Sequence, residues 1–308
     1  MPKTRVGELD LCYEWVQEPA LEGGPPNSNA GERLPVVLIM GLAAQMLLWP
    51  DGFCHGLAER GLPVLRFDNR DVGQSTWLDH LRAPSIRPQL LRWALGLPVH
   101  APYQLEAMAD DTVGLLDALG LARVHVVGAS MGGMIAQLLA IRHPRRVASL
   151  TAIMSHAGDR LSGLAKPRAM QALLRPPART REEAQDRAVQ IVRAIGSPGF
   201  PLDVAAVRDR AGRCFDRGVT PLGTLRQMNA VLAGRDRRSA LRSLRIPSLV
   251  VHGREDPLVP VGGGRRMAAA LGAELLCIDG MGHDLPQGAW SRIVDAIDRV
   301  ASAGERAR

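Results

Sequence analysis

Short apolar runs alternate with stretches of helical periodicity along most of the chain. Strands covered on both faces read as continuous apolar runs, and they occur mainly in parallel sheets with helices on each side. The alternation therefore predicts an α/β fold with a mostly parallel, eight-stranded sheet flanked by helices. The expected parallel strands are residues 35–40, 63–68, 124–127, 150–154, 248–252 and 274–278. Residues 7–16 are expected to form an antiparallel strand or hairpin at the sheet edge, and the expected core helices are residues 105–119, 131–142 and 289–301.

One connection in this pattern is much longer than the others. About ninety residues separate the strand ending near residue 154 from the strand beginning near residue 248, whereas such connections ordinarily hold a few residues. Three segments in this stretch have a helical pattern and are separated by Gly and Pro: residues 181–195, 202–216 and 220–232. We therefore expect a helical cap at 156–245, inserted between a first part of the α/β core at 1–155 and a second part at 246–302. A loop at 22–31 and a frayed tail at 303–308 complete the expected organisation.

The composition argues against several other classes of protein. The four cysteines lie far apart and no His and Cys have the spacing of a zinc site, so we expect no disulfide scaffold and no metal. The most apolar stretch, residues 36–49, is shorter than the roughly 20 residues of a membrane-spanning helix. Residues 1–15 lack the pattern of a secretory signal. We therefore expect a cytoplasmic protein without a membrane span.

The positive charge of the chain is concentrated in one segment. Residues 159–245 hold 18 Lys and Arg against 8 Asp and Glu, whereas the whole chain has a formal charge of +7. Such a segment could attract an anionic substrate. However, 36 of the 38 basic residues are Arg, so a general bias of the chain toward Arg explains the excess. No aromatic residues interleave the basic ones, and we expect no nucleic-acid partner.

The most specific motif is VVGASMGGM at residues 126–134. It contains the pattern G-x-S-x-G at Gly128, Ser130 and Gly132, directly after an apolar strand and directly before a helix. A sharp turn between strand and helix lifts the serine hydroxyl above the sheet edge, and the glycines remove side chains that would collide there. We therefore predict that Ser130 is a nucleophile. The alternative, a Gly-rich turn with an incidental serine, leaves the apolar framing unexplained.

A serine hydroxyl needs a base, and the base needs a carboxylate that orients it. Asp256 follows the expected strand 248–252 and a turn, and His283 follows a Gly-rich loop before the last helix. Both should reach the edge of the sheet at which Ser130 lies, so we predict Asp256 as the orienting acid and His283 as the base. Glu255 is expected at the surface, and Asp284 is expected to cap the last helix.

Among the eight histidines, His156 is the main competitor of His283, because it follows a strand at the same edge. No Gly-rich loop presents it, so we expect it at most in the wall of a pocket. His125 and His252 lie inside expected strands, where a hydrogen-bonded core histidine is the commoner situation.

Acyl transfer also needs donors for the negative oxygen of its tetrahedral intermediate, and two backbone N–H groups are the usual solution. We predict Met131, directly after the nucleophile, as one donor. The other is predicted to be Leu42, because Gly41 permits a turn after the strand that ends at Met40. The alternative is that Gly41 is only a turn glycine.

These residues together resemble the α/β-hydrolase superfamily from about residue 6 to residue 300. The segments IMGL at 39–42, WP at 49–50, FDNRDVGQS at 67–75 and GASMGG at 128–133 are most similar to the capped esterases related to aclacinomycin methylesterase. The resemblance implies hydrolysis of a small-molecule carboxylic ester through an acyl-enzyme, without a cofactor, by Ser130, His283 and Asp256. Many relatives carry His-Gly at the oxyanion turn, where this chain has Met40 and Gly41.

Ser130 itself argues against the haloalkane dehalogenases and epoxide hydrolases that resemble this chain elsewhere, because they use an Asp nucleophile there. The oxyanion turn also lacks the His-Gly-Gly-Pro-Gly run typical of proline iminopeptidases. Hydrolysis of a carbon–carbon bond and cofactor-free perhydrolysis use the same triad, and a non-catalytic ligand receptor can keep it. These three alternatives stay open, as do the substrate and the oligomeric state.

Overall fold

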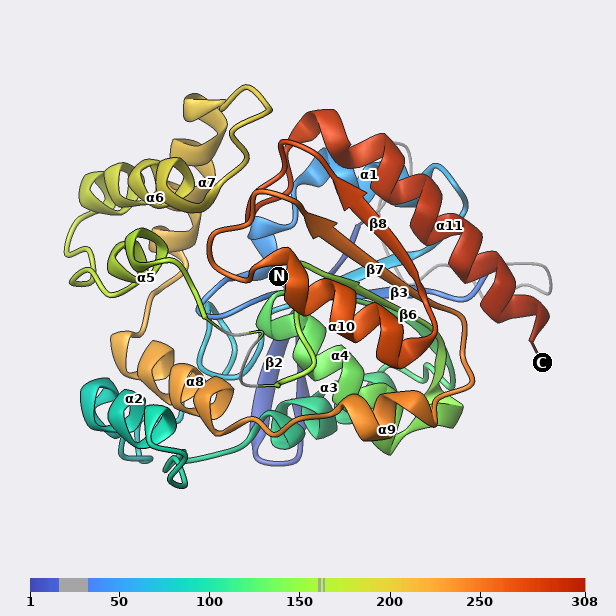
Figure 1. The fold of residues 1–308 in the computed structure, drawn as a ribbon, viewed down its shortest axis with the longest axis horizontal. Coiled ribbons are helices and arrows are strands. Elements are labelled where there is room, and N and C mark those ends of the chain that lie inside the picture. Colours follow the sequence, from blue (N-terminus) through green and yellow to red (C-terminus); the bar gives the residue numbers. More distant parts are fainter. Residues whose placement is uncertain (17–32, 160–161, 163, 308) are drawn as a thin grey trace.

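The central sheet lies between two layers of helices (Figure 1) in the computed structural model, which describes residues 1–16, 33–159, 162 and 164–307. Its eight strands are arranged in the order β1-β2-β4-β3-β5-β6-β7-β8. β1 and β2 pair antiparallel at one edge, β2 pairs antiparallel with β4, and the other neighbours are parallel. The strands are β1 (Lys3–Val6), β2 (Leu9–Val16), β3 (Val36–Ile39), β4 (Val64–Phe67), β5 (Val124–Ala129), β6 (Val147–Ile153), β7 (Ser248–Gly253) and β8 (Glu274–Ile278).

The sheet confirms the fold class predicted from the sequence, including the edge hairpin. Every residue of β3, β4, β5 and β6 is buried, which is why these strands read as continuous apolar runs. The hairpin begins earlier than predicted, at Lys3, and turns at Gly7, whose φ of 56° favours glycine. The predicted loop at 22–31 lies outside the described residues.

Each face of the sheet is covered by its own set of helices. α1 (Asp51–Ala58) and α11 (Trp290–Arg306) contact each other on one face, whereas α3 (Leu105–Ala118), α4 (Met131–Arg142) and α10 (Val261–Leu271) cover the other. Short 3-10 turns lie at Met46–Leu48, Pro144–Arg146 and Gln287–Ala289. The first ten residues of α4 are all buried, because this helix lies directly against β5 and β6 and beneath α3. The core is therefore two apolar layers, one on each side of the sheet.

The long connection between β6 and β7 is helical. Its helices are α5 (Pro167–Leu173), α6 (Arg181–Ile195), α7 (Val204–Asp216), α8 (Pro221–Ala233) and α9 (Arg238–Arg242). In Figure 1, α5 to α8 lie to the left of the sheet, beyond the ends of the parallel strands. The N-cap residues Thr180, Asp203 and Thr220 each accept a hydrogen bond from a backbone N–H of the helix that follows. We call residues 156–245 the inserted segment.

The two ends of the inserted segment lie side by side. The Arg237 N–H donates to the Ala157 carbonyl at 2.8 Å. The Arg237 guanidinium is buried, and it donates to Gln137 Oε1 on α4 and to the carbonyl oxygens of Arg235 and His156. Arg237 therefore ties the outgoing chain, the returning chain and α4 together.

A frayed tail was predicted at 303–308. For residues 303–306 this is wrong, because α11 continues to Arg306. Glu305 accepts hydrogen bonds from the Leu34 N–H and from Arg33 Nε, next to the start of β3. Gly304 is buried, and a Cβ there would collide with the Ala148 carbonyl. These contacts hold the last turns of α11 on the sheet.

Candidate active site

Ser130 lies at the sharp turn between β5 and α4. It has a φ of 54° and a ψ of −118°, and its N–H donates to the Ile153 carbonyl at 2.9 Å. A non-glycine residue in this region of φ is uncommon and strained. Glycine is needed at two positions of the motif, because the backbone packs closely there. A Cβ on Gly128 would collide with the Gly132 backbone, and a Cβ on Gly132 would collide with the Ile39 carbonyl. The turn therefore holds the Ser130 side chain at the end of β5, beside the end of β3.

The structure brings His283 and Asp256 to Ser130, although they are far apart in the sequence. His283 Nε2 lies 3.0 Å from Ser130 Oγ, and His283 Nδ1 lies 2.7 Å from Asp256 Oδ2. Asp256 is 3% exposed, and its Oδ1 accepts hydrogen bonds from the Leu258 and Val259 N–H groups. Since Oδ2 is left for the imidazole, Nδ1 carries the proton and the lone pair of Nε2 faces the serine hydroxyl.

His252 lies beneath this pair but does not compete for it. It is buried inside β7, its Nε2 donates to the Val259 carbonyl at 2.7 Å, and it stays 3.6 Å from Asp256 Oδ2. Burial lowers the pKa of His252, so its ring is neutral. Asp256 therefore keeps a single imidazole partner.

The loop that carries His283 is held by the connection between α6 and α7. The His283 N–H donates to the Ile195 carbonyl at 2.7 Å, the Gly282 N–H donates to Ser197 Oγ at 2.9 Å, and the Gly199 N–H donates to the Gly280 carbonyl at 2.9 Å. Sequence reasoning missed Ile195 and Ser197, because no local signal in a helix end predicts which distant loop it will meet.

Two expectations about neighbouring carboxylates are wrong. Asp284 does not cap the last helix, because α11 begins at Trp290 with Ala289 as its N-cap; Asp284 instead accepts a hydrogen bond from Ser197. Burial raises the pKa of Asp284. Glu255 is half-buried rather than at the surface, and its Oε2 accepts from the Gly280 N–H at 2.6 Å. Both side chains therefore support the histidine loop.

The turn after β3 lies against Ser130. A Cβ on Gly41 would come within 3.2 Å of Ser130 Cβ and 3.3 Å of the Ala129 carbonyl. Met131 is the first residue of α4, so its N–H has no acceptor within the helix. Among the described residues, neither the Met131 nor the Leu42 N–H has a hydrogen-bond acceptor. The two residues predicted as oxyanion donors therefore each have a backbone N–H that no other described group uses.

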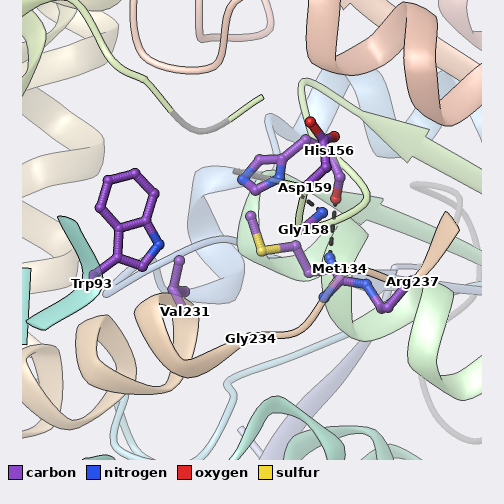
Figure 2. Close-up of a pocket in the computed structure, with 8 residues that line it drawn as sticks. All are labelled: Trp93, Met134, His156, Gly158, Asp159, Val231, Gly234 and Arg237. Carbon is purple, nitrogen blue, oxygen red and sulfur yellow. Dashed lines mark hydrogen bonds between the residues drawn. The ribbon is translucent and has the colours of Figure 1, made fainter. Parts of the chain in front are cut away.

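A small cavity is lined by residues of α4, of α8 and of the chain that follows β6 (Figure 2). It is lined by His156, Met134 and Val231, and Met134 is four residues beyond Ser130 on α4. His156 Nδ1 accepts a hydrogen bond from the Gly158 N–H at 3.0 Å, and among the described residues no hydrogen bond joins the His156 ring to Ser130. Burial, and then the charge of Arg237, lower the pKa of His156 to about 4. This histidine is therefore part of a cavity wall, as expected.

Replacing His156 by Gln is expected to weaken the loss of stability in acid. The pKa of His156 is about 4 in the folded chain and 6.5 at its ordinary value, so between these values only the unfolded chain takes up the proton. The stability that depends on neutral His156 is complete above pH 6.5 and is lost as the pH falls toward 4. Between pH 7 and pH 4, we expect the free energy of unfolding to fall by about 3 kcal/mol more for the wild type than for H156Q. Urea denaturation at each pH measures this, and equal losses would contradict it.

Two further structural features bear on the type of protein. Within the described ranges, no helix combines the length and the hydropathy needed to cross a membrane. The same part of the chain holds no group of three or more His, Cys, Asp and Glu side chains that could bind a metal ion.

Comparison with known proteins places the chain. A family model described as the α/β hydrolase fold matches residues 35–190, and a second model, described as TAP-like protein, matches residues 226–300. The rhodomycin D methylesterase of Streptomyces sp. strain C5 is 30% identical over 289 residues, which cover 85% of this chain and 89% of that protein. The chain belongs to the α/β-hydrolase fold family. Its methylesterase relatives support a hydrolytic enzyme.

This α/β hydrolase is also similar to hydrolases with other names. The 2-hydroxymuconate semialdehyde hydrolase of Pseudomonas sp. strain CF600 is 28% identical over 266 residues, covering 80% of this chain and 86% of that protein. Among solved structures, the enol-lactonase of Burkholderia xenovorans LB400 aligns with a TM-score of 0.64 at 22% identity, covering 99% of this chain and 100% of that one. At that identity the structural match establishes the fold alone.

Proposed function

We propose that the chain is a serine esterase that cleaves a carboxylic ester through an acyl-enzyme intermediate. The observation that carries this proposal is the chain of contacts from Asp256 through His283 to Ser130 Oγ, at 2.7 and 3.0 Å. These distances are within hydrogen-bond reach of both proton positions that nucleophilic catalysis requires. In this proposal Ser130 is the nucleophile, His283 the general base and Asp256 the orienting acid.

Acylation follows from the direction of each hydrogen bond. Ser130 Oγ attacks the carbonyl carbon of the ester while its proton passes to His283 Nε2, and Asp256 stabilises the imidazolium that forms. The carbonyl oxygen becomes an oxyanion, and the Leu42 and Met131 N–H groups are the proposed donors to it. His283 then returns the proton to the alkoxide, which leaves as the alcohol, and the acyl group stays on Ser130.

Deacylation uses the same residues in the reverse roles. Water takes the place of the alcohol and loses a proton to His283 Nε2 as it attacks the acyl carbon. A second oxyanion forms at the same two N–H groups. When it collapses, the proton returns to Ser130 Oγ and the carboxylic acid leaves.

The substrate class rests on the relatives and on the inserted segment. Relatives that are methylesterases support a small-molecule ester, and a methyl ester is the first class to test. Residues 156–245 are proposed to act as a cap, because α5 to α8 lie beyond the carboxyl ends of the parallel strands, where ligands of open α/β sheets bind.

Labelling and turnover of the wild-type chain test the proposal. A fluorophosphonate probe should form an adduct that mass spectrometry maps to the peptide containing Ser130, and a panel of methyl and p-nitrophenyl esters should be hydrolysed. The 28% identity to a 2-hydroxymuconate semialdehyde hydrolase makes vinylogous diketones the comparison panel. Labelling with turnover of the diketones alone would indicate carbon–carbon bond hydrolysis. An unlabelled chain that binds esters without turning them over would indicate a receptor.

A further inference from the structure

The turn that carries the proposed oxyanion donor is bound by a side chain of the inserted segment. Gln227, on α8, is fully buried, and its Oε1 accepts a hydrogen bond from the Ala43 N–H at 2.8 Å. We infer that Gln227 is a positioning residue, which fixes the Leu42 N–H toward Ser130 and so makes the oxyanion hole depend on the placement of α8. This inference rests on the proposed esterase function.

The geometry of the turn explains how a contact to Ala43 acts on Leu42. The Gly41 carbonyl accepts a hydrogen bond from the Ala44 N–H at 3.2 Å. In a trans peptide the C=O and the following N–H point in opposite directions, so the Leu42 N–H is turned away from the inside of the turn. Ala43 has a φ of 55°, which is unfavourable for a residue with a Cβ. A conformation of this kind persists only where surrounding contacts hold it, and the Gln227 bond is such a contact.

Gln227 is itself held rigidly. Its Nε2 donates to the Arg70 carbonyl at 2.8 Å, so both ends of its amide group are used. The preceding residue, Arg226, is fully buried and binds both oxygens of Asp71 at 2.7 and 2.9 Å. Asp71 also accepts from Tyr103 Oη at 2.8 Å. α8 therefore binds two consecutive residues of the turn after β4, and Gln227 connects that turn with the oxyanion turn.

The inserted segment also binds Gln45, at the far end of residues 40–45, which we call the oxyanion turn. Gln45 is buried, and its Nε2 donates to the carbonyl oxygens of Cys214, near the end of α7, and of Gly218, between α7 and α8. Arg217 in turn donates to Gln45 Oε1 at 3.0 Å. Contacts from the inserted segment therefore support this turn at Ala43 and at Gln45.

Gln227→Met tests the inference, because it removes both hydrogen bonds and keeps a side chain of similar length. Since a lost oxyanion donor costs about 10²–10³ in kcat, we expect a displaced one to lower kcat by roughly 10–100-fold. KM should change less than about twofold, because the donor acts on the transition state, and the pH profile of kcat should keep its shape, because His283 and Asp256 are unaffected. The affinity for an alkyl trifluoromethyl ketone, which forms the oxyanion, should fall in parallel with kcat.

Asn229→Leu is the matched control. Asn229 is also fully buried on α8, but its Nδ2 donates to the Pro84 and Leu225 carbonyls, away from the oxyanion turn. Both variants lose a buried amide group, so both should lose stability, whereas only Q227M should lose kcat. Activity is expressed per serine labelled to completion by fluorophosphonate, so that unfolded protein is not counted. Gln227→Glu keeps an acceptor for the Ala43 N–H, and its kcat should lie between those of Q227M and the wild type.

The outcomes separate this inference from the proposed function. A wild-type chain without ester turnover or labelling would contradict both. An active wild type with unchanged kcat in Q227M, or with equal losses of kcat in Q227M and N229L, would overturn the positioning role alone. A loss confined to KM would overturn it as well, because it would place Gln227 in substrate binding.

Discussion

Ser130→Ala is expected to lower kcat/KM for ester hydrolysis by about 10⁴–10⁶-fold, because the variant has no atom that can form the acyl-enzyme. The residual rate would come from the oxyanion donors acting on water. The fold should be retained since, within the described ranges, the hydroxyl forms a hydrogen bond with His283 Nε2 alone. A steady-state assay with p-nitrophenyl esters measures the loss, and mass spectrometry should show no fluorophosphonate adduct on the variant.

The control for this variant is Ser248→Ala. Ser248 begins β7, at the opposite end of the strand from Asp256, and its Oγ donates to the Ile246 carbonyl. It should hydrolyse esters at the wild-type rate and be labelled fully. Turnover by S130A within tenfold of the wild type would show that another residue is the nucleophile.

Asp256→Asn is expected to lower kcat by about 10⁴-fold with little change in stability. The reason lies in the partners of the two carboxylate oxygens. The Leu258 and Val259 N–H groups both point at Oδ1, so the oxygen of the asparagine must stay there and its NH₂ group must face His283 Nδ1. Nδ1 then has to accept, the proton moves to Nε2, and the imidazole donates to Ser130 instead of accepting from it.

Measurement of kcat across pH 6–9 checks this expectation, with Asp279→Asn as the matched control. Asp279 lies in the same loop region as His283, is exposed, and pairs with Arg254 at the surface. D279N should keep the activity of the wild type. A loss below tenfold in D256N would mean that the carboxylate does not set the tautomer of His283.

The chain's strands and the residues that meet at Ser130 could be predicted because their signals are local. A buried parallel strand is an apolar run, and the turn from β5 to α4 needs glycine at two positions that the motif displays. α10 was not predicted, because its sequence VGGGRRMAAAL begins with three glycines after Val261, which disfavour a helix in isolation. Packing against β7 and α9 compensates for that propensity.

The supports of the site could not be predicted, because they join residues far apart in the sequence. Gln227 contacts Ala43, and Ser197 contacts Gly282, with no periodicity or motif to indicate either pair. The error over Asp284 has the same origin. A carboxylate shortly before a helix is a common N-cap, but here Asp284 accepts a hydrogen bond from Ser197 of the inserted segment. Local chemistry predicted which residues meet, whereas tertiary contacts decide how firmly they are held.

The two ends of the inserted segment lie next to each other, and this affects how the substrate specificity could be changed. Because Ala157 and Arg237 are hydrogen-bonded neighbours, a different segment could be grafted between them without moving β6 or β7. A graft that lacked equivalents of Ile195, Ser197 and Gln227 would leave the histidine loop and the oxyanion turn without their supports. New substrates are therefore more readily reached by recombining whole segments together with these three anchors than by exchanging the helices alone.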